Sequence, residues 1–121
     1  MSGYWVAQRH EDRFTSGIPD VSFVMIDGRS GWVELKAGER FSVAAEQIQW
    51  MVSRAQFGQC CILAARGEGG WLAVRVTPIN APMLRTATRA KDLAAIGYVG
   101  TAPEVIEKCL QQSPNPLEKI E

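Results

Sequence analysis

Short, mainly apolar runs rich in β-branched and aromatic residues dominate the first part of the chain, and this bias is typical of strands. The runs cover Tyr4–Gln8, Val21–Ile26 and Trp32–Ala37, and apolar and polar residues alternate in the last of them. Between the last two lies Asp27-Gly28-Arg29-Ser30-Gly31, whose residue types are those of a turn. We therefore expect the second and third runs to form a β-hairpin.

A different period appears in the middle of the chain, over Val43–Phe57. Apolar residues there recur at spacings of three and four, which predicts a helix with one buried face. Ser42 has the side chain of an N-cap, and Gly58 stands where a glycine commonly ends a helix. Two further strands, Gln59–Ala65 and Trp71–Thr77, are expected to form a second hairpin.

The pattern weakens after the second hairpin and becomes helical. Pro82 is suited to begin a short helix, and Arg85–Ile96 is expected to be helical in part. Thr101–Gln112 carries an apolar stripe, with Pro103 near its first helical position. Ser113–Glu121 is expected to be a frayed, flexible tail.

The order of these elements predicts an α/β or α+β fold. In it the main helix packs on a mixed β-sheet, and the C-terminal third is helical. A length of 121 residues and a hydrophobic content of 46 % are enough for one core. We expect one domain over residues 1–112, followed by the tail of residues 113–121.

The composition of the chain indicates in which compartment the protein works. No apolar run approaches the roughly 20 residues that cross a bilayer, and the first residues lack the features of a secretory signal. We therefore expect a soluble, cytoplasmic protein without membrane contact.

Three cysteines, two of them adjacent, are a poor disulfide framework and are expected to be buried thiols. Net charge is zero, but residues 1–91 hold 11 basic against 8 acidic side chains, which allows a local basic surface.

Three polar residues of the predicted first hairpin form the constellation with most chemical meaning. With the turn centred at residues 28–29, Asp20 comes opposite a position near Glu34, about 5 Å away across the strands. Glu34 and Lys36 share one strand face, whereas Leu35 points the other way, into the core. Two carboxylates and a lysine suit phosphodiester hydrolysis, since Mg²⁺ prefers carboxylate oxygens and a lysine can offset charge in the transition state. Taken singly, each fragment is more often an ordinary turn or a solvated strand face.

Two motifs of the chain closely resemble the PD-(D/E)XK nuclease superfamily. They are Gly17-Ile18-Pro19-Asp20 and Gly31-Trp32-Val33-Glu34-Leu35-Lys36, followed by Gln47 and Trp50 in the next helix. Within the superfamily they look most like the small phage-type and VRR-NUC-like branch, which is related to Holliday-junction resolvases. The resemblance covers roughly Arg9–Ala65 and implies a restriction-endonuclease-like core.

The resemblance implies a role for each matching residue. Asp20 and Glu34 would bind Mg²⁺ or Mn²⁺, assisted by the carbonyl of Leu35. Lys36 would be the catalytic lysine, and Gln47 would approach the active centre from the helix.

The chain departs from the superfamily at its front. Many members carry a helix before the first strand, with an acidic residue that Glu11 would match as a further metal ligand. Only three residues precede the first predicted strand here, so we expect the helix to be missing or reduced, and the role of Glu11 stays open. The departure also leaves Trp5, Trp32 and Trp71 on strands without that cover. It therefore predicts a homo-oligomer, most simply a two-fold dimer.

Basic residues outside the hairpin are candidates for nucleic-acid binding. Arg40 follows the Glu-x-Lys strand, and Arg85, Arg89 and Lys91 lie in the densest basic stretch of the chain. These side chains could contact phosphates. A solvated helix face explains the basic stretch equally well.

Taken together, these features predict a Mg²⁺- or Mn²⁺-dependent endodeoxyribonuclease. The resemblance implies branched DNA, such as a Holliday junction, as the substrate, and a phage origin. Two alternatives stay open. The same fold can serve as an inactive module that binds nucleic acid or a protein partner, and a phage factor that blocks a host enzyme would also suit the zero net charge and the four tryptophans.

Overall fold

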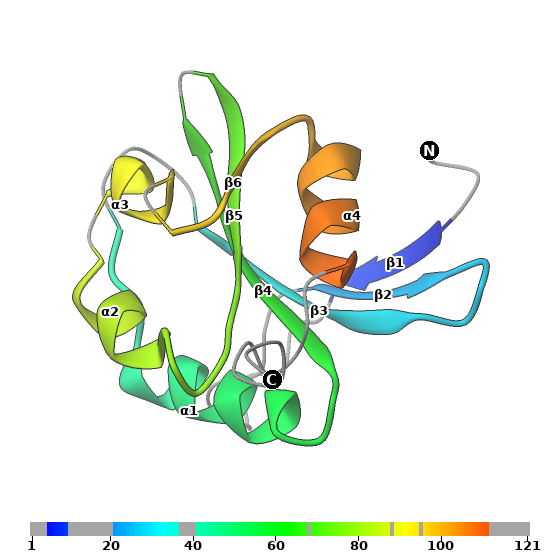
Figure 1. Cartoon of the computed structure of the whole chain (residues 1–121), viewed down its shortest axis with the longest axis horizontal. Coiled ribbons are helices and arrows are strands. Elements are labelled where there is room, and N and C mark those ends of the chain that lie inside the picture. Colours follow the sequence, from blue (N-terminus) through cyan, green and yellow to red (C-terminus); the bar gives the residue numbers. More distant parts are fainter. Residues whose placement is uncertain are drawn as a thin grey trace, which may run out of the picture.

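A six-stranded mixed sheet forms the centre of the part of the chain that the structure describes (Figure 1). The computed structural model describes residues 5–9, 21–36, 41–67, 69–87, 89–94 and 96–111. Neighbouring strands follow the order of the chain, from β1 at one edge to β6 at the other. The pairing of β3 with β4 is parallel, and the other pairings are antiparallel. The prediction of a mixed sheet with helices packed on it is therefore confirmed.

The first three strands form an antiparallel meander. They are β1 (Trp5–Arg9), β2 (Val21–Met25) and β3 (Ser30–Lys36). The predicted hairpin is confirmed, but Val24 pairs with Ser30, so its turn centres on Asp27, earlier than expected. The reason is Gly28, whose φ of 90° suits a tight turn. Its amide donates to the Met25 carbonyl at 2.9 Å.

The main helix, α1 (Ala45–Ala55), connects β3 to the parallel strand β4 (Cys60–Gly67). It begins later than predicted, because Ala44 is the N-cap and Ser42 is not. The residue between them, Val43, is already buried in the core, so the chain reaches the core before it becomes helical.

Gly58 ends the main helix as predicted. Its φ is 91°, a conformation that few residues with a side chain adopt. Its amide donates to the carbonyl of Ala55 at 3.0 Å, and the amide of Gln59 donates to the carbonyl of Arg54 at 3.3 Å. These bonds satisfy carbonyls of the last helical turn and direct the chain into β4.

The remaining elements complete the sheet and cover it. They are β5 (Gly70–Arg75), α2 (Ala81–Thr86), α3 (Ala90–Ala94), β6 (Tyr98–Gly100) and α4 (Ala102–Gln111). The second hairpin and the last helix were predicted, and the helical stretch after Pro82 is two short helices. Strand β6 was not predicted, because three residues are too few to show alternation. No helix in the described ranges is long and apolar enough to cross a membrane.

Each face of the sheet has its own apolar core. On one face, Cys61 and Leu63 of β4 pack in a cluster with Ile48 and Met51 of α1 and with α2 and α3. On the other face, Ile62 of β4 belongs to a cluster with β2, β3 and α4. Figure 1 shows the same division, with α1, α2 and α3 on one side of β4 and β5 and α4 on the other. Side chains of β4 point alternately to the two faces and so belong to both cores, which explains why this strand is apolar throughout.

The three cysteines are buried, as predicted, and none of them forms a disulfide. Cys61 lies in the core on the α1 side, and Cys60 and Cys109 lie in the core on the α4 side. Burial raises the pKa of Cys60 to about 11 and the pKa of both Cys61 and Cys109 to about 12. The thiols therefore act as small apolar side chains and not as nucleophiles.

Candidate active site

Glu34 and Lys36 lie near the C-terminal end of β3, on the face that α1 covers. Their side chains point the same way because one residue separates them on a strand. The Lys36 Nζ atom is 3.2 Å from Glu34 Oε2. Glu34 is 3 % exposed, although a carboxylate is rarely so deeply buried without partners. The predicted pairing of these two side chains on one face is therefore present in the structure.

Gln47 completes the cluster from the first turn of α1. Its Oε1 atom accepts a hydrogen bond of 3.0 Å from Lys36 Nζ. Its Nε2 atom donates to Glu34 Oε2 at 2.5 Å. Each of the three side chains thus contacts the other two, and the two contacts of Gln47 span 11 and 13 residues of sequence. We refer to Glu34, Lys36 and Gln47 as the polar triad.

The triad sits where a low-polarity core meets the surface. Glu34 Oε2 receives donors from an ammonium group and from an amide, which offset the cost of burying its charge. The Lys36 side chain is 15 % exposed, so its amine lies near the surface while the carboxylate is enclosed. Such an arrangement can hold a carboxylate ionised and in a fixed position, which suits cation binding or orientation of a reacting group.

Leu35 departs from the sequence-based prediction. It was expected to point into the core, but it is 37 % exposed. Its direction is the predicted one, opposite to Glu34 and Lys36. The surface there is a shallow apolar groove lined by Val33, Trp71 and residues of α4, so Leu35 is covered only in part.

Three predicted site residues, Asp20, Glu11 and Arg40, lie outside the described residues, as does the predicted tail of residues 113–121. The described part of β2 begins at Val21, which pairs with Val33. Among the described residues, no group of three or more His, Cys, Asp and Glu side chains gathers as a metal site would. The triad therefore contributes a single carboxylate.

Of the predicted basic residues, Arg89 and Lys91 lie near the triad's end of the sheet. Arg85 is on the last turn of α2, and Arg89 and Lys91 flank the start of α3. A Cβ placed on Gly67, at the end of β4, would lie 3.7 Å from Ala90 Cβ in α3. Lys36 pairs with a β4 residue two positions before Gly67. Parallel strands end at the same edge, so α3 begins near the edge where the triad lies.

Two tryptophans adjoin the triad on the α1 face. Trp32 lies two residues before Glu34 on β3 and packs edge to face on Trp50 of α1, with ring centroids 5.1 Å apart. The guanidinium of Arg54 lies over the Trp50 ring, 4.6 Å from its centroid. From the sequence, Trp32 was expected on a strand without cover and Trp50 was only part of the motif resemblance, and Arg54 was missed. The signal was the three- and four-residue spacing of Gln47, Trp50 and Arg54 along one helix.

Part of the chain is similar to a solved structure. No family model matches the chain. No curated protein matches it either. The solved structure of Hjc, a Holliday junction resolvase from the archaeal hyperthermophile Archaeoglobus fulgidus, is similar to it with a TM-score of 0.48 and 19 % sequence identity. The similarity covers 62 % of this chain and 67 % of that one.

Proposed function

We propose that the protein is a metal-dependent endonuclease that hydrolyses phosphodiester bonds of DNA. The observation that carries the proposal is the polar triad. Glu34 is a buried carboxylate with two polar partners: its Oε2 atom lies 3.2 Å from the amine of Lys36 and accepts a hydrogen bond from Gln47. Alternation on β3 accounts for the first contact, but the contact with Gln47 requires the crossover helix to dock at one particular rotation. A solvated strand face, the ordinary explanation of Glu-x-Lys, does not predict burial of the glutamate.

Asp20 is the proposed second carboxylate. Val21 and Val33 are cross-strand partners, so continuing β2 by one residue would pair Asp20 with Glu34. Directly opposed residues of antiparallel strands share a face, with Cβ atoms about 5 Å apart. Val21 and Val33 both line the groove on the α4 side. Alternation would therefore turn Asp20 to the α1 side, beside Glu34.

Asp20, Glu34 and the carbonyl of Leu35 would hold a divalent cation, Mg²⁺ or Mn²⁺. The donor chemistry fits, because both ions prefer carboxylate and carbonyl oxygens, and Mg²⁺ commonly uses one or two protein carboxylates. The cation supplies positive charge that activates water and polarises the phosphoryl oxygens. The contribution of Glu11 as a further ligand remains part of the same proposal.

Lys36 and Gln47 would act on the substrate side of this centre. The Lys36 amine is near the surface, where it can donate to a phosphate oxygen and stabilise the charge that develops on it. Gln47 accepts from Lys36 and donates to Glu34, so it fixes the distance between the ammonium group and the carboxylate. Gln47 is thus a positioning residue, and Lys36 is the catalytic one.

Branched DNA is the proposed substrate, following the resemblance of the motifs to resolvases. Arg89 and Lys91, near the triad's end of the sheet, and Arg85 on α2 would contact backbone phosphates, with Arg40 as a further candidate. These contacts would position the DNA without reading its sequence. A two-fold dimer would place two centres on the two strands to be cut.

A cleavage assay tests the proposal. The purified chain is incubated with an end-labelled four-way junction or with a linear duplex of matched sequence, in Mg²⁺, Mn²⁺ or EDTA. We expect cleavage in both metals, none in EDTA, and faster cleavage of the junction. Absence of cleavage of either DNA in both metals would favour the inactive binding module. Equal rates on the two substrates would retain the nuclease and remove the preference for branches.

Binding of the divalent metal by Asp20 has a separate test. Mn²⁺ is titrated calorimetrically into the wild type, Asp20→Asn and Glu107→Gln. Glu107 is a suitable control because it is also a carboxylate paired with a cation, Arg29 at 3.2 Å, but it lies on α4. We expect a site in the wild type and in the control, and binding weakened at least tenfold in Asp20→Asn. Equal binding by all three proteins would exclude Asp20 as a ligand.

A further inference from the structure

Four side chains form a strip along α1 and the turn that follows it. They are Gln47, Trp50, Arg54 and Phe57, at successive spacings of three, four and three residues. Residues so spaced lie on one side of a helix, one above the other. The side chains that α1 buries are Ile48, Met51 and Ala55, so the strip borders the buried face. Its first member belongs to the polar triad, whereas the other three have no part in the proposed chemistry.

The middle of the strip is an aromatic ring held between two neighbours. Trp50 is half-buried and meets Trp32 at an interplanar angle of 78°. Arg54 is exposed, and its guanidinium lies 4.6 Å from the centroid of the Trp50 ring. Packing against Trp32 fixes the indole, and the guanidinium adds a planar cation beside it. The pair offers both a stacking surface and a positive charge at the edge of the site.

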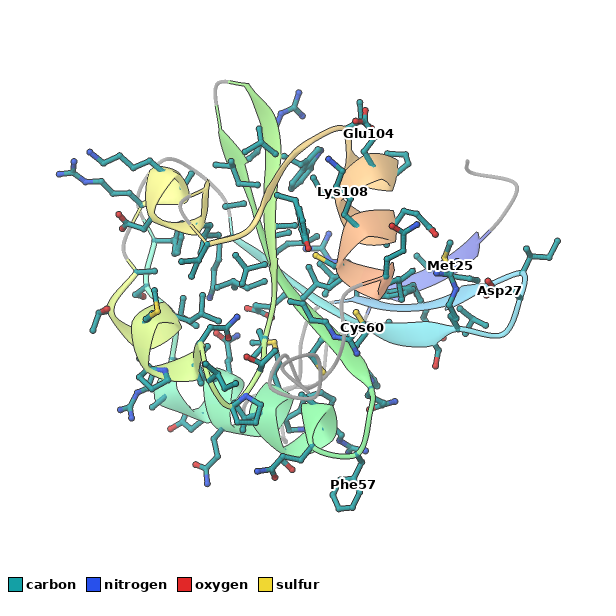
Figure 2. The ribbon with its side chains drawn as sticks, in the orientation of Figure 1. Met25, Asp27, Phe57, Cys60, Glu104 and Lys108 are labelled. Carbon is teal, nitrogen blue, oxygen red and sulfur yellow. The ribbon has the colours of Figure 1, made fainter. Side chains whose placement is uncertain are left out.

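The far end of the strip is Phe57, which is 89 % exposed. Figure 2 shows its ring pointing away from the body of the protein just beyond α1. A phenylalanine side chain would gain about 1.5–3 kcal/mol from full burial, so its exposure contributes nothing to this chain's own stability. A single exposed apolar residue needs no explanation, but this one continues a strip that already holds a tryptophan and an arginine.

We propose that the strip binds an unpaired DNA strand and leads it to the polar triad. The inference rests on the proposed nuclease function and names the substrate feature that the site recognises. Aromatic rings alternating with cations are the means by which proteins hold single strands, because every unpaired base has a free face for stacking. Duplex bases have no free faces except at the ends. Within α1, the residues from Gln47 to Ala55 span about 12 Å at 1.5 Å per residue, a length of about three to four stacked nucleotides.

The chain contains its own matched control for an arginine over a tryptophan. Arg66 lies over Trp71, 6.0 Å from the ring centroid, on the β4–β5 hairpin. Trp71 faces the groove on the α4 side, away from α1. If any Arg–Trp pair of this protein attracted a single strand, changing Arg66 would weaken binding as much as changing Arg54. The exposed Met83 on α2 is the corresponding control for Phe57.

The test is fluorescence anisotropy with a labelled oligothymidylate and, separately, a labelled duplex, in EDTA so that nothing is cleaved. Phe57→Ala and Arg54→Gln are the test variants, and Met83→Ala and Arg66→Gln are the controls. Loss of one stacked base weakens single-strand binding by roughly fivefold or more. We expect that loss in both test variants, with duplex binding unchanged and both controls like the wild type. Phe57→Ala keeps the test decisive even if changes near Trp50 disturb the core.

Two results would overturn the proposal. One is single-strand affinity that does not differ between the test variants and the controls, or no single-strand binding by the wild type. The other is an equal loss of single-strand and duplex binding, which would mean a general charge or folding effect. Failure of the nuclease function would look different, because cleavage would be absent in Mg²⁺ while the binding pattern in EDTA persisted.

Discussion

At the scale of residues, the candidate chemistry depends on how a buried carboxylate is partnered. Alternation on a strand is enough to predict that Glu34 and Lys36 share a face. It is not enough to predict Gln47, because the contact depends on how α1 rotates on the sheet. Only the resemblance of the motifs suggested that residue. Burial of Glu34 could not be predicted from the sequence either, since the side chains that cover it come from other elements.

Lys36→Ala tests the residue assigned to the transition state. Removing the ammonium group should lower kcat by about a hundredfold or more, as loss of a charge-stabilising donor commonly does. DNA affinity in EDTA should change little, because one of several cations is lost. Lys108→Ala is the control, since Lys108 is an exposed lysine of α4 beside Tyr98. If Lys36→Ala and the wild type had equal rate constants in single-turnover cleavage, Lys36 would have no part in the mechanism.

The cysteines give a residue-scale prediction that is independent of function. Their pKa values are raised to between about 11 and about 12 by burial, so the thiolate fraction at pH 8 is very small. We expect a chromogenic disulfide reagent to react very slowly with the native protein. In denaturant, the same reagent should react with all three thiols. Reactivity at constant pH should rise steeply when denaturant unfolds the protein, because all three thiols are buried in the native state. Rapid modification of a thiol in the native state would show that one of the three is accessible.

At the scale of elements, the main helix is predicted from its three- and four-residue period, and the longer strands are predicted from short runs of strand-forming apolar residues bounded by turns. Prediction from these patterns fails where tertiary packing decides. The parallel pairing of β3 with β4, strand β6, and the start of α1 at Ala45 depend on partners far away in the sequence. The segment Asp27–Gly31 shows the same limit, since its two glycines look alike in the sequence. Gly28 is a turn residue with positive φ, whereas Gly31 is a strand residue packed against a neighbouring backbone.

Gly31→Ala tests that distinction. A Cβ at residue 31 would lie 2.1 Å from the Cys60 carbonyl oxygen and 2.9 Å from Phe23 Cζ. Relief requires β3 and β4 to move apart, so the free energy of unfolding should fall by about 2 kcal/mol or more. Gly69→Ala is the control, because its Cβ would meet Val99 at an ordinary 3.9 Å. Equal urea midpoints for the two variants would contradict the packing of the parallel pair.

At the scale of the whole molecule, the two faces of the sheet are covered unequally. Within the described ranges, three helices lie on the α1 face, and α4 covers part of the other. A groove of about 160 Å³ remains beside α4, with a wholly apolar lining of Val21, Val33, Leu35, Ala64, Trp71, Ala102, Val105 and Ile106. The predicted dimer would bury this groove, with Trp71 as the interface tryptophan.

Light scattering during size exclusion at low micromolar concentration tests the assembly. We expect twice the chain mass of 13.3 kDa for the wild type. Ile106→Glu, in the groove, should shift the mass toward one chain. Ile79→Glu, at an exposed site before α2, should not. A concentration-independent mass of 13.3 kDa for the wild type would refute the dimer and leave the polar triad unaffected.

The central claim is that DNA cleavage by this protein requires a divalent metal and the carboxylate of Glu34. The most direct measurement compares single-turnover cleavage of a four-way junction by the wild type, Glu34→Gln and Glu107→Gln, with and without Mg²⁺. Circular dichroism verifies that all three are folded. The account predicts metal-dependent cleavage by the wild type and by Glu107→Gln, and a rate at least a thousandfold lower for Glu34→Gln. Cleavage by folded Glu34→Gln at the wild-type rate, or cleavage that persists in EDTA, would contradict it.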